Sequence, residues 1–158
     1  MRKKLVVFIL GLICGILLSR GFLWLYKYYS LREAMKKDPV VKHILKAEEL
    51  RKKGKTEECI KEYKEALAFR PNDPVLLEYL ADAYIESGNY EGAIKIFKKM
   101  GEKGDSFALY RLGEIYWRIG RVKEALEVLE KSKEMGNPLA EKKIETIKSE
   151  IKRAGERK

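Results

Sequence analysis

The sequence predicts an all-α fold, in which an N-terminal transmembrane helix precedes an α-solenoid of about three helix pairs and a C-terminal capping helix. Three observations lead to this prediction. One long apolar run lies near the N-terminus, small and aromatic residues recur after residue 38 at intervals of 32 to 34 positions, and the chain is 37% charged with only 4 Pro. A charged composition with few prolines favours helices with solvated outer faces over a β-sandwich or barrel.

The membrane anchor is predicted at residues 5–26, within a basic segment of residues 1–37 that also holds a juxtamembrane helix. At 1.5 Å per residue the run makes about 33 Å of helix, which is enough to cross the hydrocarbon core of a bilayer. Trp24 and Tyr26 supply an aromatic belt at its end. A cleaved signal peptide is the alternative, but no A-x-A-like cleavage site follows the run. We therefore expect an uncleaved, single-pass anchor.

Small residues recur every four positions inside this run, at Gly11, Gly15 and Ser19. Such a stripe allows two membrane helices to approach closely and form a homodimer, although glycine is also common in membrane helices generally. Basic residues flank the run on both sides, so charge alone does not fix its orientation. Long domains are translocated largely regardless of charge, and we expect the repeat domain to lie outside the cytoplasm.

The distribution of charge argues against a nucleic-acid-binding domain. The chain carries a net charge of +10, but residues 1–37 account for +7 and residues 38–158 for only +3. A basic excess beside an apolar run is typical of a membrane-flanking segment. The globular part therefore has no strong positive field for nucleic acid.

The stretch LADAYIESGNYEGAIKIF, residues 80–97, has the spacing of two antiparallel helices that touch across a short turn. Small residues stand where the helices approach, aromatic residues fill the space beside them, and a glycine marks the turn. These positions are Leu80, Ala81, Tyr84, Gly88, Tyr90, Ala93 and Phe97. This pattern resembles the tetratricopeptide (TPR) repeat.

The resemblance implies three repeats in the domain of residues 38–158, at about 40–73, 74–105 and 106–137. The second fits best, and the first is degenerate, because Lys46 and Thr56 replace a leucine and an aromatic residue. The third contains the LGxxY core and also looks similar to Sel1-like repeats. A capping helix is expected at about residues 138–154, since one apolar stripe on a charged helix can cover the last repeat.

No residue pattern indicates catalysis, a metal or a cofactor. The single histidine, His43, has no Cys or Asp placed by sequence to work with it, and we interpret it as structural. Cys14 would lie in the bilayer, and Cys59 occupies a small-residue position where a packed thiol is expected. Phosphate-binding loops and zinc or nucleophile motifs do not occur in the sequence. We therefore do not expect an enzyme.

In the family that the chain resembles, the first helix of each repeat lines a binding groove. By that resemblance, the groove would combine an acidic patch from the second repeat with an aromatic wall from the third. The candidate partner-binding residues are Glu78, Asp82, Ile85, Phe107, Tyr110, Glu114 and Trp117. Aromatic anchors beside fixed charges are typical of binding hot spots.

The groove predicts a protein or peptide partner with apolar and basic residues. The best-known peptide-binding variant of the family holds a C-terminal carboxylate with Lys and Asn, whereas Glu78 and Asp82 have the opposite charge. The chain is thus interpreted as a membrane-tethered adaptor or scaffold. The alternative is a chaperone-like or secretion-accessory factor that holds unfolded or newly exported polypeptides.

Overall fold

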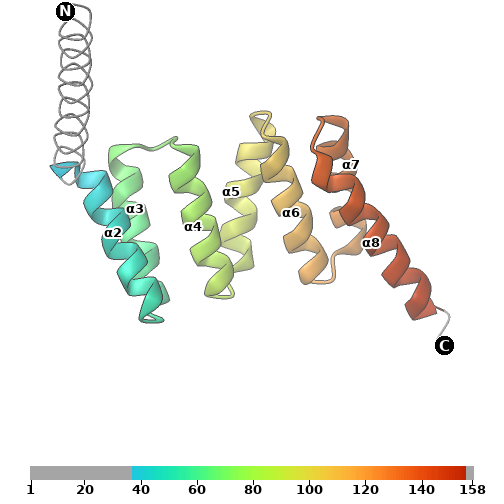
Figure 1. The fold of residues 1–158 in the computed structure, drawn as a ribbon, viewed down its shortest axis with the longest axis horizontal. Helices are drawn as coiled ribbons and strands as arrows, with labels where there is room; N and C mark the ends of the chain where they lie inside the picture. Colours follow the sequence, from blue (N-terminus) through green and yellow to red (C-terminus); the bar gives the residue numbers. More distant parts are fainter. Residues whose placement is uncertain (1–36, 156–158) are drawn as a thin grey trace, which may run out of the picture. The chain divides into compact units, whose positions relative to one another are not determined.

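The computed structural model describes residues 37–155, which form α-helices joined by short turns (Figure 1). The all-α prediction is confirmed for this part of the chain. The chain divides into two compact units between Lys42 and His43, and the packing described below is that of the second unit. The helices are α2 (Pro39–Lys52), α3 (Thr56–Phe69), α4 (Pro74–Glu86), α5 (Tyr90–Glu102), α6 (Ser106–Arg118), α7 (Val122–Glu134) and α8 (Pro138–Gly155).

The predicted anchor at residues 5–26, with its stripe of small residues, lies outside the described residues. Between residues 37 and 155, none of the helices combines the length and the apolar character needed to cross a membrane.

Each helix from α3 onward packs against the next one along the chain, as in a solenoid. Buried apolar side chains form three clusters that follow one another along the stack. The first joins α2, α3 and α4, the second joins α4 to α7, and the third joins α7 to α8. Ala81, Ala93 and Phe97 are at most 1% exposed, so the residues that defined the repeat pattern lie in the core.

Turn chemistry explains why the helices end where they do. The turns after α2, α4, α5, α6 and α7 each contain a glycine with positive φ, for example Gly88 at φ 77° between α4 and α5. Side chains with a Cβ rarely adopt this conformation, which is common at helix C-termini. Each of α4, α6 and α8 begins behind an Asx residue, which is Asp73, Asp105 and Asn137 respectively. The Oδ1 atom of each accepts a hydrogen bond from a backbone N–H in the first turn of the helix.

Gly113 allows α6 and α7 to approach closely. A Cβ at this position would lie 2.5 Å from Cγ of Leu129 and 3.3 Å from the carbonyl oxygen of Ala125. We expect Gly113→Ala to destabilise the domain by about 1–3 kcal/mol, because overpacking outweighs the better helix propensity of alanine. Urea unfolding measures this change. Gly155→Ala, where the added Cβ meets nothing within 4 Å, is the matched control and should leave the midpoint unchanged.

Candidate functional site

The predicted groove residues lie on two helices of successive repeats. Glu78, Asp82 and Ile85 are on α4, and Phe107, Tyr110, Glu114 and Trp117 are on α6. The structure joins the two sets through a side chain that was not among the predicted residues, Arg111 of α6. We call the surface formed by these eight residues the α4–α6 face.

Arg111 is held between the two helices. Its Nη2 atom donates to the carboxylate of Asp82, and its Nη1 atom lies 3.9 Å from Oε2 of Glu114. Its guanidinium carbon lies 5.5 Å from the centre of the Phe97 ring, and its side chain is 26% exposed. The charge of Asp82 therefore already has a partner inside the chain. The predicted acidic patch is reduced to Glu78, which has no ion-pair partner among residues 37–155.

A shallow pocket of about 50 Å³ lies beside Arg111. Ile85 of α4 and Ile115 of α6 form its apolar part, and the side chains of Arg111, Glu114 and Arg118 form its polar part. Two of the predicted residues, Ile85 and Glu114, thus line one depression. Its size suits one small aliphatic side chain with a polar neighbour.

The capping helix contacts part of the predicted aromatic wall. Tyr110 and Trp117 are half-buried and pack against the apolar cluster that α7 and α8 share. Nζ of Lys143 on α8 lies 3.4 Å from Oε1 of Glu114, which also accepts a 3.1 Å hydrogen bond from the Tyr110 hydroxyl. Burial, followed by the adjacent Glu114 carboxylate, raises the pKa of Tyr110. These groups stabilise the junction with α8.

Phe107 is the aromatic residue of the set that is most open to a partner. Its side chain is 42% exposed, and its ring stacks on Tyr110 with 6.0 Å between the centroids. Tyr110 therefore positions Phe107 from one side and contacts α8 with the other. Only part of the predicted wall is free surface.

The single histidine takes part in a structural network between α2 and α3. Nδ1 of His43 lies 2.7 Å from Glu62 Oε2, and Nζ of Lys46 lies 2.7 Å from Glu62 Oε1. Glu62 is a buried carboxylate, 7% exposed. The hydrogen bond from Lys46 and, to a smaller extent, that from His43 lower the pKa of Glu62 in spite of its burial. Lys46, the departure from the repeat pattern in α2, thus pairs with the buried carboxylate of α3.

This network predicts a pH dependence of stability. The folded pKa of Glu62 lies below its usual value of 4.5, so ionised Glu62 stabilises the fold fully above about pH 4.5, and the contribution is lost as the pH falls through the folded pKa. We expect Glu62→Gln to be less stable than the parent chain at pH 7. The difference between their urea midpoints should shrink as the pH is lowered below 4.5. An unchanged difference down to acid unfolding would contradict this prediction.

The described residues contain neither a metal-ion site nor an exposed thiol. Among residues 37–155, no group of three or more His, Cys, Asp and Glu side chains could hold a metal ion. Cys59 is fully buried, and burial raises the pKa of its thiol. As expected from the sequence, it is a packed side chain. The α4–α6 face is therefore our candidate functional site.

Comparison with known proteins gives two matches to family models. Both are described as tetratricopeptide repeat, and they cover residues 50–108 and 108–141. Among curated proteins, no sequence match was found. The matches do not test the Sel1-like features of the third repeat, which stay a prediction.

Several solved structures have a similar fold. The Sgt2 TPR domain from Aspergillus fumigatus is 25% identical with a TM-score of 0.60, over 76% of this chain and 83% of that chain. The TPR2AB domain of yeast Sti1, in a complex with pHSP90, is 25% identical with a TM-score of 0.62, over 73% of this chain and 48% of that chain. The second TPR domain of human RPAP3, in complex with an HSP70 peptide, is 24% identical with a TM-score of 0.56, over 70% and 95% of the two chains.

Proposed function

We propose, because this chain belongs to the tetratricopeptide repeat family, that it is a protein-interaction adaptor whose α4–α6 face binds a segment of a partner protein. The observation that carries the proposal is the arrangement of this face. The exposed ring of Phe107, the carboxylate of Glu78, which forms no ion pair within the described part of the chain, and the pocket beside Ile85 are anchors of different chemistry on α4 and α6. The complex of the Sti1 domain with pHSP90 supports the same class of function.

The charges on the face favour a partner segment with apolar and basic residues. A basic side chain can pair with Glu78, and an aliphatic side chain can enter the pocket beside Ile85. An acidic segment would have to compete with Asp82, which Arg111 already binds within the chain. An acidic ligand that took Arg111 would leave Asp82 without its cationic partner, which costs free energy. The ion pair within the chain therefore opposes binding of an acidic ligand.

The proposed adaptor is tethered to a membrane through residues 5–26, with the repeats outside the cytoplasm. The apolar run and its basic flanks support the tether, and the general tendency of long domains to be translocated supports the orientation. A reporter that is active only outside the cytoplasm, fused after Lys158, should be active. Activity of a cytoplasmic reporter at the same position would contradict the orientation.

Two substitutions test the binding face, with matched peptides as probes. One peptide has alternating leucine and lysine, and the other has glutamate in place of each lysine. We expect Glu78→Lys to weaken binding of the basic peptide about tenfold and to strengthen that of the acidic one. Trp117→Ala should weaken the binding of both peptides, because the half-buried Trp117 side chain packs between the face and the apolar cluster of α7 and α8.

The control is Glu127→Lys on α7, which makes the same charge change at an exposed site away from the face. It should bind like the parent chain. Circular dichroism confirms that each variant is folded before its affinity is compared. Unchanged peptide affinity in both Glu78→Lys and Trp117→Ala would contradict the proposal. If the parent chain instead binds unfolded polypeptides of any sequence with equal affinity, the chaperone-like alternative is favoured.

A further inference from the structure

One edge of the helix stack exposes an unusual number of apolar side chains. The connections α3–α4, α5–α6 and α7–α8 all lie on the same side of the stack (Figure 1). We call this side the inter-repeat edge. Five large apolar side chains there are between 39% and 56% exposed: Phe69, Val75, Phe107, Met135 and Leu139.

Three of these side chains repeat with the fold. Val75, Phe107 and Leu139 are each the second residue of a helix, α4, α6 and α8, and they follow one another at intervals of 32 residues. Asn137 joins the starts of α6 and α8, since its Nδ2 donates to the carbonyl oxygen of Ser106, next to Phe107, at 3.2 Å and its Oδ1 accepts from Leu139 N–H at 2.9 Å. The capping side chains thus satisfy backbone N–H groups at the starts of these helices, while the apolar side chains next to them are exposed.

The opposite edge has a different character. Its turns, residues 53–55, 87–89 and 119–121, expose no large apolar side chain, and ion pairs lie beside two of them, such as Lys53 with Glu49 at 2.5 Å. Near that edge, Ile151 of α8 is the one exposed large apolar residue among those described. The two edges of the same stack therefore suit different surroundings.

The course of the chain indicates what faces the apolar edge. The second unit begins at His43, whose ring stacks on Phe69 at 6.0 Å between centroids, so the first residue of this unit lies at the inter-repeat edge. Sixteen residues, 27–42, separate the apolar run of residues 5–26 from His43. Cationic side chains flank the exposed apolar ones. Arg70 is 51% exposed and lies 4.0 Å from Asp73, and Lys133 is 45% exposed and lies 2.7 Å from Glu141. Side chains of this kind lie in the headgroup region of a bilayer beside buried apolar groups.

We propose that the inter-repeat edge docks on the surface of the membrane that holds the anchor. Phe69, Val75, Met135 and Leu139 enter the interface, and Arg70 and Lys133 lie among the phosphates. Phe107 lies where this edge meets the α4–α6 face. This inference rests on the anchor proposed above. In the docked orientation, the opposite, polar edge faces away from the lipid. The proposed partner would then reach the α4–α6 face along the membrane.

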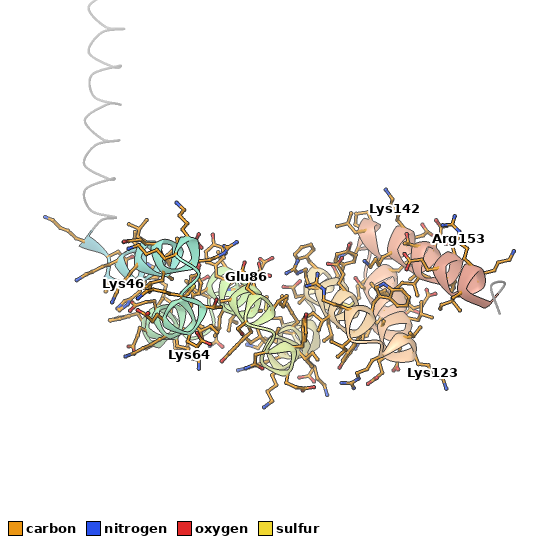
Figure 2. The ribbon with its side chains drawn as sticks, turned by 90° about the horizontal axis from the view of Figure 1, so that it is seen from below. Lys46, Lys64, Glu86, Lys123, Lys142 and Arg153 are labelled. Atoms are coloured by element: carbon orange, nitrogen blue, oxygen red, sulfur yellow. The ribbon has the colours of Figure 1, made fainter. Side chains whose placement is uncertain are left out.

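Depth-dependent quenching of a fluorescent label tests the inference. The full chain with Cys14→Ser is reconstituted into phosphatidylcholine–phosphatidylglycerol vesicles, and the label is placed at Phe69→Cys or Leu139→Cys. Both sites are exposed, and Cys59 is fully buried and does not compete for the label. The control label is at Lys123→Cys. Lys123 is an exposed residue at the start of α7, beside the polar edge. Figure 2 shows the Lys123 side chain on the same side of the stack as that of Lys64. The quencher is a phospholipid with a nitroxide in its headgroup region.

We expect both edge labels to lose most of their emission and the Lys123→Cys label to keep it. Equal quenching at the two edges, or none at either, overturns the inference. Energy transfer between edge labels of different copies, without quenching by lipid, also overturns it in favour of a second copy as the occupant. Flotation of the vesicles separates the two proposals. A chain that does not float has no anchor, and a chain that floats with unquenched labels has an anchor but no docked edge.

Discussion

Phe97→Ala is expected to lower the free energy of unfolding by about 3–5 kcal/mol, the range found when a buried phenylalanine side chain is removed. Phe97 is 1% exposed and belongs to the apolar cluster that joins α4 to α7. The neighbouring helices cannot collapse onto the cavity, because each is also packed on its other side. Urea unfolding of the purified chain, followed by circular dichroism, measures the loss.

The same substitution should weaken the candidate site. The guanidinium of Arg111 lies over the Phe97 ring, so removing the ring frees Arg111 to move and loosens its ion pair with Asp82. Phe97→Leu keeps most of the apolar volume and serves as the control, with a smaller loss of stability. An alanine variant within about 1 kcal/mol of the parent chain would show that Phe97 is not a core residue of this fold.

The second repeat could be predicted because its pattern depends on local geometry. Helix contacts recur every three to four residues, so small residues at Ala81 and Ala93 indicate where two helices approach. Both are fully buried. A turn glycine between them fixes which segments form the pair. These constraints act within about 20 residues and can be read from one sequence.

The pairing of charged groups could not be predicted in the same way. Asp82 and Arg111 are 29 residues apart, and His43 and Glu62 are 19 apart. Periodicity gives the face of a helix on which a side chain lies, but the rotation of one helix against its neighbour selects its partner. Because the sequence does not give this rotation, it indicates Lys46 only as a departure from the repeat pattern and Asp82 only as an open acidic group. Both are paired within the chain.

The role of α8 shows a similar limit of sequence reasoning. One apolar stripe predicts that a helix covers the end of the stack, but not which residues of the last repeat it contacts. The structure places α8 against Tyr110 and Trp117, and it pairs Lys143 with Glu114. Tyr110, Trp117 and Glu114 are therefore partly engaged at the junction with α8, whereas Glu78, Phe107 and the pocket beside Ile85 stay open to a partner.

Leu129→Ala should detach this helix before the rest of the stack unfolds. Leu129 is fully buried and packs with Ala140, Ile144 and Ile147 of α8. We expect a loss of about 2–5 kcal/mol, with the largest rise in amide hydrogen exchange in α8, because a terminal helix has a neighbour on one side only. Leu139→Ala removes a leucine that is 48% exposed and should leave exchange in α8 unchanged. A uniform rise over α3 to α8 would instead mean that the domain unfolds as one unit, with α8 as an integral part of it and not a separable cap.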